Sequence, residues 1–206
     1  MAPVGVARVA PLFTKMVDCF GVLTLADYQA LKGLGFGAAG RYLETLKAAE
    51  RDDAFSAGVP LLLLSDAPIG TLSATVGHSK AASLLALASA LGAPKGLSLM
   101  TDFEAQSGDG LGYDAALTGD LAQGGFVPLG YGGAGEQGTG HQLFELPNVH
   151  LYWRGGSLGI PEPDCGFGIW QIPPLDQTLA GVGTRVDVSM IGADTRGRSP
   201  ILWYPD

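Results

Sequence analysis

Two carboxylates lie two positions apart in Asp102-Phe103-Glu104, directly after the apolar run at residues 96–101. Such a run is typical of a buried strand, and side chains two positions apart on a strand point to the same side. Two acids held close together repel, which pushes their pKa values apart and favours a proton on one of them near neutral pH. This is the chemistry of a glycosidase. The alternative is that Asp102 caps a turn and Glu104 is a solvated loop charge, since acidic residues are mostly exposed.

The composition is that of a compact folded chain. The sequence has 206 residues, of which 47% are hydrophobic and only 16% are charged, and it contains 32 glycines. A chain of this length can bury a substantial core within one domain. We therefore expect a single domain over residues 1–206 with many tight turns.

The charge of the chain argues against nucleic acid as a partner. The formal net charge is -8 and no run of basic residues occurs, whereas binding to phosphate backbones relies on clustered Lys and Arg. A neutral sugar polymer is compatible with an acidic cleft. We expect a glycan rather than a nucleic acid.

Cysteine and histidine spacing predicts neither a disulfide framework nor a metal site. Cys19 and Cys165 lie far apart and outside any C-x-x-C motif, so we expect two buried thiols. His78, His141 and His150 have no metal-binding spacing. The glycine-dense segment 130–140 lacks the context of a nucleotide loop. We predict no metal and no cofactor.

The N-terminal residues do not have the pattern of a secretory signal, because no charged segment precedes a long apolar stretch. No segment approaches the ~20 apolar residues of a membrane span. We expect a protein that is not embedded in a membrane and that reaches any extracellular site by another route.

Apolar runs alternate with helical patterns through the first two thirds of the chain. The predicted helices cover residues 25–32 (capped by Thr24), 49–57, 75–91, 113–123 and 141–146. The predicted strands cover residues 15–20, 37–43, 59–65, 98–102, 126–131, 149–153, 166–172 and 185–190. Parallel β-α order with about eight strands indicates an α/β fold, a (β/α)8 TIM-type barrel with irregular last units. An open doubly wound sheet is the second candidate.

In a barrel of this kind, functional groups gather at the carboxyl ends of the strands. Acids and aromatic residues occupy most of the predicted ends. These ends are Asp18, Arg41 and Tyr42, Ser65 and Asp66, Asp102 and Glu104, Tyr131, Trp153 and Arg154, Trp170 and Gln171, and Asp187. The sequence therefore predicts one rim that carries several carboxylates.

Seven short motifs along the chain together resemble a known domain. They are Val17-Asp18-Cys19-Phe20, Gly40-Arg41-Tyr42-Leu43, Val59-Pro60-Leu61-Leu62, Asp102-Phe103-Glu104, the segment 125–131, Trp170-Gln171 and Val186-Asp187. In this order, from about Lys15 to Ser189, they resemble the glycoside-hydrolase-like domain of unknown function 1906, a relative of the family 25 lysozymes. The resemblance implies a TIM-type barrel in a secreted or phage-linked protein. Its lysozyme relatives cut the bond between muramic acid and glucosamine in peptidoglycan.

The resemblance also implies roles for individual residues. Glu104 matches the general acid and Asp102 its electrostatic partner, while Asp18 and Asp187 match carboxylates from the first and last strands. The structural alternative is that Asp18 is a buried acid bonded to backbone amides and Asp187 a turn former.

Six further residues at the rim are candidate substrate contacts: Arg41, Tyr42, Tyr131, Trp153, Trp170 and Gln171. The alternative is that Tyr131, Trp153 and Trp170 are core aromatics. Arg41 could equally pair with an acid to neutralise it.

Three functions follow from this pattern. The first is a lysozyme-like glycoside hydrolase that acts on peptidoglycan or a related amino-sugar polymer, outside the cell or in a virion, with phage or secretion-machinery partners. The second is a non-catalytic glycan-binding or phage structural module that keeps the barrel as a scaffold. The third is a sugar-phosphate enzyme, but Arg41 and Arg154 alone are weak support for phosphate binding.

Overall fold

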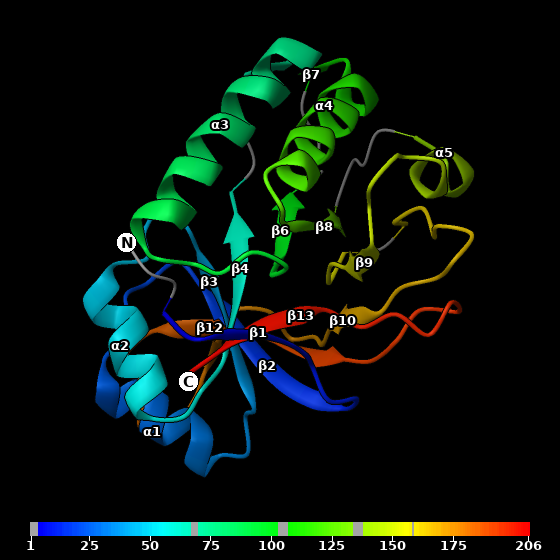
Figure 1. The fold of residues 1–206 in the computed structure, drawn as a ribbon. Coiled ribbons are helices and arrows are strands. Elements are labelled where there is room, and N and C mark those ends of the chain that lie inside the picture. The colour runs from blue at the N-terminus through cyan, green and yellow to red at the C-terminus, as the bar shows by residue number, and fades with distance from the viewer. Residues whose placement is uncertain (1–3, 67–69, 103–106, 134–137, 158) are drawn as a thin grey trace.

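A closed barrel of eight strands forms the centre of the molecule (Figure 1). The computed structural model describes residues 4–66, 70–102, 107–133, 138–157 and 159–206. The barrel strands, in spatial order, are β2 (Thr14–Cys19), β3 (Ala38–Tyr42), β4 (Leu61–Ser65), β6 (Ser98–Asp102), β8 (Val127–Gly132), β9 (Leu151–Arg154), β10 (Ile169–Gln171) and β12 (Arg185–Ile191). Strand β12 pairs with β2 and closes the ring. Each predicted strand overlaps one of these, and the predicted barrel is confirmed over the open sheet.

The last barrel strand runs against the others. Neighbouring strands from β2 to β10 are parallel, whereas β12 is antiparallel to both β10 and β2. The prediction of a parallel order is therefore wrong for β12. The link before it contains only the two-residue strand β11 (Gln177–Thr178), which pairs back onto β12. Because a parallel return needs a long crossover, usually a helix, this link produces an antiparallel strand.

Helices follow the first four barrel strands and cover the outside of that half of the barrel. They are α1 (Leu25–Gly33), α2 (Ala48–Ser56), α3 (Ala74–Ala90) and α4 (Gly110–Gln123), and the short α5 (Gly140–Phe144) precedes β9. Thr24 caps α1 in a capping box with Asp27, as the sequence predicts for the cap. In the described chain no helix follows β9 or β10, and none is long and apolar enough to span a membrane.

Besides β11, four short strands of the described chain lie outside the barrel. Strands β1 (Val6–Val9) and β13 (Ile201–Tyr204) pair with each other, and β13 extends the sheet from β4. Strands β5 (Thr71–Leu72) and β7 (Ser107–Gly108) form a separate pair beside the helices α3 and α4. The sequence pattern did not predict any of these strands.

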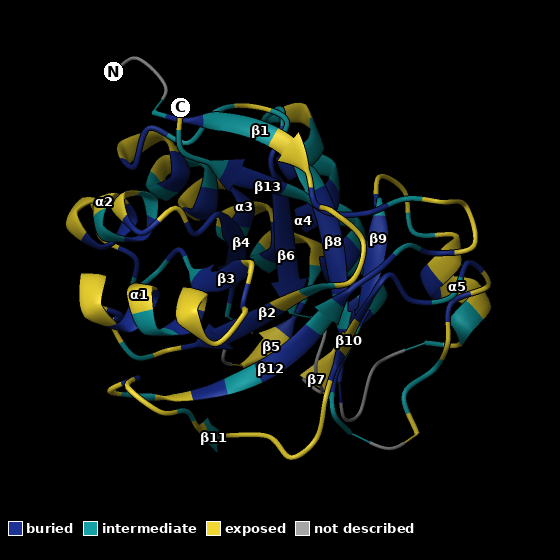
Figure 2. Ribbon diagram, turned by 90° about the horizontal axis from the view of Figure 1, so that it is seen from below, coloured by how far each residue is buried: buried dark blue, intermediate teal, exposed yellow. Residues whose placement is uncertain are grey.

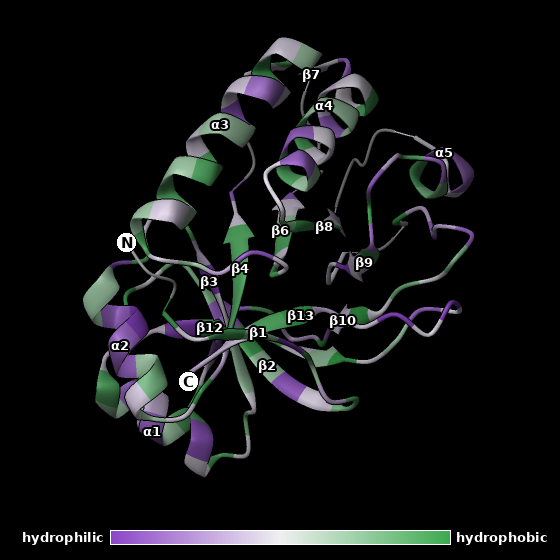
Figure 3. Ribbon diagram, in the orientation of Figure 1, coloured by the Kyte–Doolittle hydropathy of each residue, from purple (hydrophilic) through white to green (hydrophobic). Residues whose placement is uncertain are grey.

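The core has two layers, which follow from the alternation of side chains along each strand. On β4, Leu62 and Leu64 belong to the cluster inside the barrel, whereas Leu61 and Leu63 pack outward beneath the helices. Figure 2 shows the strands buried and the outer helix faces exposed, and Figure 3 shows the apolar character of β4 and β6. This alternation also decides which polar residues reach the barrel interior.

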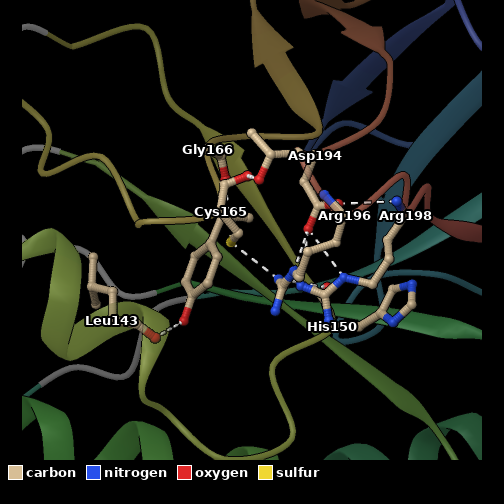
Figure 4. A network of polar contacts seen from close by, with 9 residues as sticks. Leu143, His150, Cys165, Gly166, Asp194, Arg196 and Arg198 are labelled. Atoms are coloured by element: carbon tan, nitrogen blue, oxygen red, sulfur yellow. Dashed lines mark hydrogen bonds and ion pairs between the residues drawn. The ribbon is translucent and has the colours of Figure 1, made fainter.

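After β12, at the end of the strand that lies away from Asp187, a buried acid fixes the chain (Figure 4). The side chain of Asp194 is fully buried, and its Oδ2 accepts hydrogen bonds from Arg196 Nε at 2.9 Å and Arg198 Nε at 3.0 Å. Arg196 also contacts the thiol of Cys165 at 3.0 Å. Cys19 and Cys165 are both buried and unpaired, as predicted. This network holds the turn that leads into β13.

Candidate active site

A cavity of about 300 Å³ opens at the mouth of the barrel. We call it the main cavity. The predicted site residues that line it are Asp18, Tyr42, Asp102, Tyr131, Trp153, Gln171 and Asp187. They come from seven of the eight barrel strands, so the fold brings together residues that are far apart in sequence. Additional lining residues are Phe20, Asp66, Met100, Ser157 and Leu175.

Asp18 and Asp187 face each other directly across the pairing of β2 and β12. Side chains at such opposed positions have Cβ atoms roughly 5 Å apart. Asp187 lies near the start of β12, and it reaches the mouth because β12 runs antiparallel to its neighbours. The sequence therefore placed Asp187 at the correct rim, although it assumed the carboxyl end of a parallel strand.

The two acids have different hydrogen-bond environments. Oδ2 of Asp187 accepts a hydrogen bond from Gln171 Nε2 at 2.8 Å, and Oδ1 accepts one from the backbone amide of Asp176 at 2.5 Å. In contrast, Oδ2 of Asp18 is buried and has no hydrogen-bond partner among the described residues. Both carboxylate oxygens of Asp187 therefore accept hydrogen bonds, whereas Oδ2 of Asp18 accepts none from the described residues.

Burial raises the pKa of Asp18 well above its ordinary value, and the negative charge of Asp187 raises it further. The positive charge of Arg41 opposes both effects without cancelling them. Asp18 therefore favours its protonated form, beside the charge of Asp187. The arrangement resembles other paired acids in which one carboxyl keeps a proton.

Asp102 lies at the end of β6, half-buried in the wall of the main cavity, opposite Tyr131 on β8. Burial raises the pKa of Tyr42, and the charges of Asp18 and Asp102 add to the effect, so the Tyr42 hydroxyl stays protonated. Glu104 lies outside the described residues, and its place at the site stays a prediction.

Aromatic side chains form two walls of the main cavity. The rings of Phe20 and Tyr42 stack with centroids 3.9 Å apart and an interplanar angle of 10°, and Phe20 is 53% exposed. The rings of Tyr131 and Trp153 pack edge to face with centroids 5.5 Å apart and an interplanar angle of 81°, and Trp153 is almost fully buried. Phe20 therefore offers an open ring face. Sequence reasoning did not select it as a site residue, although it lies two positions after Asp18.

Gln171 connects the aromatic wall to the acids. Its Oε1 accepts hydrogen bonds from the Tyr131 hydroxyl at 3.0 Å and from the Gly156 amide at 2.8 Å, while its Nε2 donates to Asp187. These contacts use both ends of the amide group. Gln171 thus orients Tyr131 and Asp187 relative to each other.

Two predicted substrate contacts lie elsewhere. On β3, Ala38 points into the barrel and Tyr42 lines the cavity, so the intervening Arg41 points outward. Arg41 is fully buried, and its Nε pairs with Glu50 at 2.7 Å. Because it has no exposed surface, Arg41 is not a contact for a bound glycan. This is the neutralising role that the sequence left open.

Trp170 also faces away from the main cavity. On β10, the neighbours Ile169 and Gln171 are buried, and Trp170 is 37% exposed on the outer surface. It lines a separate apolar groove with Phe13 and Ile172. Strand alternation again explains why a residue next to a site residue points to the other face.

Within the described ranges, no group of three or more His, Cys, Asp or Glu side chains is placed to hold a metal ion. The site consists of carboxylates, an amide and aromatic rings.

We expect Asp18→Asn to gain stability relative to the wild type as the pH rises from 4 to 7. Because the pKa of Asp18 is raised in the folded state, the folded wild type binds more protons than the unfolded chain above pH ~3.8 and loses stability as pH rises towards the folded pKa. Asn mimics the protonated acid and lacks this loss. Urea unfolding at both pH values would measure the difference, with Asp53→Asn as a control for net charge. If Asp18→Asn instead lost stability relative to the wild type as the pH rises, the raised pKa of Asp18 would be contradicted.

Comparisons with known proteins identify the fold. No family model matches the sequence, and no curated protein matches it. An uncharacterized protein from B. stearothermophilus has a similar structure, with a TM-score of 0.69, 18% identity, and coverage of 86% of this chain and 95% of that one. The catalytic domain of the endolysin ply40 from bacteriophage P40 of Listeria monocytogenes has a TM-score of 0.60 at 18% identity, covering 88% of this chain and 94% of that one.

A family 25 glycosyl hydrolase from Bacillus anthracis has a TM-score of 0.54 at 13% identity, with coverage of 91% of this chain and 92% of that one. These identities are low, so the likeness concerns the arrangement of the backbone. The chain has the barrel fold of these structures, which include a family 25 glycosyl hydrolase and the catalytic domain of an endolysin.

Proposed function

We propose that the protein is a lysozyme-like glycoside hydrolase, of the N-acetylmuramidase kind, that cleaves peptidoglycan or a related amino-sugar polymer by carboxylate acid catalysis. The observation that carries this proposal is the convergence of Asp18, Asp102 and Asp187 from separate strands on one cavity. The fold likeness to an endolysin catalytic domain and a family 25 glycosyl hydrolase supports it. The finer relation to the domain of unknown function 1906 is part of the same proposal.

The proposed chemistry divides the work among the acids. Glu104 donates a proton to the leaving glycosidic oxygen, and Asp102 stabilises the positive charge that develops on the sugar ring. Asp18 keeps its own proton and so adds no further negative charge to the centre of the cavity. Burial favours the proton on Asp18, and Asp187, held by Gln171 and the Asp176 amide, adds a negative charge that favours it further.

The walls of the main cavity suit a sugar polymer. Sugar rings present apolar C–H faces that pack on aromatic rings, and the exposed face of Phe20, backed by Tyr42, offers such a surface. Carboxylates and Gln171 supply acceptors and donors for the hydroxyl groups around each ring. Because peptidoglycan lies outside the cytoplasm, the proposed action is extracellular or virion-associated, with phage or secretion-machinery partners.

The test is hydrolysis of purified peptidoglycan, followed by turbidity and by release of reducing ends. We expect the wild type to release reducing ends and Asp102→Asn to lower the rate by about 10²-fold, because a group that stabilises transition-state charge is lost. Asp53→Asn, on the outside of the barrel in α2, is the matched control.

Binding of peptidoglycan by the wild type with no release of reducing ends would overturn the hydrolase proposal. It would instead select the non-catalytic glycan-binding module. Equal rates for the wild type and Asp102→Asn would reject the role given to Asp102.

A further inference from the structure

A second cavity of about 280 Å³, which we call the side cavity, lies beside the main cavity. The two share Asp18, Phe20, Tyr42 and Asp187 as wall residues. The side cavity is completed by residues from the start of β12, from the loop before it and from the end of β2, among them Gly21, Asp176, Thr184 and Arg185. A polymer that fills the main cavity can therefore continue past the Asp18–Asp187 pair into the side cavity.

At the far wall of the side cavity, the chain after β2 lies close to the residue that precedes β12. A Cβ atom added at Gly21 would lie 2.4 Å from Oγ1 and 3.1 Å from Cβ of Thr184, so a larger residue would push Thr184 and the chain after β2 apart. Two segments far apart in sequence thus meet at the cavity wall. This contact gives the side cavity a defined shape next to Arg185.

The charges of the two cavities are uneven. Among the described residues that line them, the acidic residues are Asp66, Asp102, Asp176, Asp187 and the protonated Asp18, and Arg185 supplies the one cationic side chain. A carboxylate on a bound glycan would be repelled by the acids of the main cavity and attracted to Arg185. The charge pattern therefore favours one placement of an acidic substituent.

Arg185 has free capacity for such a ligand. Its side chain is 64% exposed, and its one charged partner, Asp176, is 62% exposed. The ion pair uses Nη1 of the guanidinium, which carries five N–H donors in a planar fork suited to a carboxylate. Because an exposed pair of this kind contributes little stability, a ligand carboxylate can replace Asp176 at small cost.

Asp176 also links Arg185 to the acids of the main cavity. Its backbone has a φ of 58°, in the left-handed region, and its amide donates to Oδ1 of Asp187. The same residue thus holds Asp187 through its backbone and Arg185 through its side chain. A ligand bound at Arg185 would lie a short distance from the proposed reaction centre.

We propose that Arg185 binds a carboxylate substituent of the glycan in the side cavity and so fixes which sugar lies on each side of the acidic pair. The inference rests on the proposed function and adds the substrate class, an amino-sugar polymer with acidic substituents. In peptidoglycan the carboxylate has two sources, the lactyl group of a peptide-free muramic acid and the peptide stem. Both present the same chemistry to Arg185.

Binding measurements by calorimetry test the proposal, with Glu104→Gln as the background so that the glycan stays intact. The probes are peptide-free glycan strands with free lactyl carboxylates, the same strands after conversion of the carboxylates to amides, and peptide-bearing strands. We expect the acidic strands to bind roughly fivefold more tightly than the amidated strands, and Arg185→Gln to abolish the difference. Tighter binding of the peptide-bearing strands than of the amidated strands would identify the peptide as a source.

A second variant acts in the opposite direction. Asp176→Asn removes the competing carboxylate but keeps a residue that tolerates a positive φ, so the preference for acidic strands should increase. Arg8→Gln removes an exposed charge on β1, outside both cavities, and should leave the preference unchanged.

Equal affinities for acidic and amidated strands, or a preference that survives Arg185→Gln, would overturn the assignment of Arg185. Hydrolysis by the wild type is measured separately on both kinds of strand. Hydrolysis without any carboxylate preference rejects only the Arg185 site, whereas an Arg185-dependent preference without hydrolysis rejects only the hydrolase.

Discussion

Replacing Glu104 by Gln is expected to lower the rate of peptidoglycan hydrolysis by about 10²- to 10⁴-fold. Gln has nearly the shape of Glu but carries no proton that it can transfer to a leaving oxygen. The measurement is the initial rate of reducing-end release at saturating substrate, compared with Asp53→Asn. Binding of the intact glycan should change little, because Gln keeps nearly the shape of Glu and an oxygen that accepts hydrogen bonds.

An activated substrate makes this prediction specific for acid catalysis. With a nitrophenyl glycoside of the same sugar, the leaving group is a weak base and needs little protonation, so the loss caused by Glu104→Gln should become small. Similar losses on both substrates would mean that Glu104 is not the proton donor. If Asp18, whose pKa is raised, were the donor instead, Asp18→Asn would show the dependence on the leaving group.

The barrel and most of its rim could be predicted from the sequence. Apolar runs of five to seven residues separated by helical patterns indicate the strands, and the strand ends then place Asp18, Asp102 and Tyr131 near one another, as they lie in the main cavity. Even Gln171, at the end of the short strand β10, lines the main cavity. Such positions can be predicted because the periodicity of the sequence indicates where each strand begins and ends.

The sequence pattern does not show which face of its strand a residue at the rim occupies. Arg41 and Tyr42 are adjacent, yet Tyr42 lines the cavity and Arg41 is buried in the outer layer. Trp170 and Gln171 differ in the same way. A one-residue change in register exchanges the two faces, and a sequence alone does not fix register this finely.

The sequence pattern also could not predict the direction of β12 or the loop residues that line the two cavities. The link before β12 is rich in Gly and Pro, and its pairing through β11 becomes apparent only in the fold. Phe20 and Arg185 line the side cavity together because β2 and β12 are neighbours, and these strands are separated by most of the chain. Contacts between the two ends of a closed barrel have no local signal.

Replacing Arg41 by Met is expected to lower the free energy of unfolding by about 3–5 kcal/mol, the usual cost of leaving one member of a buried ion pair without its partner. Glu50 is 3% exposed, and its Oε1 accepts hydrogen bonds from Arg41 Nε, the Leu23 amide and the Tyr28 hydroxyl. Without Arg41, its negative charge would remain in the space between α2 and the barrel. Urea unfolding at pH 7 measures the loss.

The double variant Arg41→Met/Glu50→Gln separates the ion pair from simple packing. If the cost arises from the unpaired charge of Glu50, neutralising that charge should restore most of the stability, and the two substitutions should be strongly non-additive. Additive losses would instead assign the effect to packing and to the hydrogen bond from Arg41 to the Cys19 carbonyl. Activity per folded molecule adds a second criterion. A substrate contact would raise KM in the stable double variant, whereas a buried ion pair outside the main cavity leaves KM unchanged, because no atom of Arg41 reaches the bound glycan.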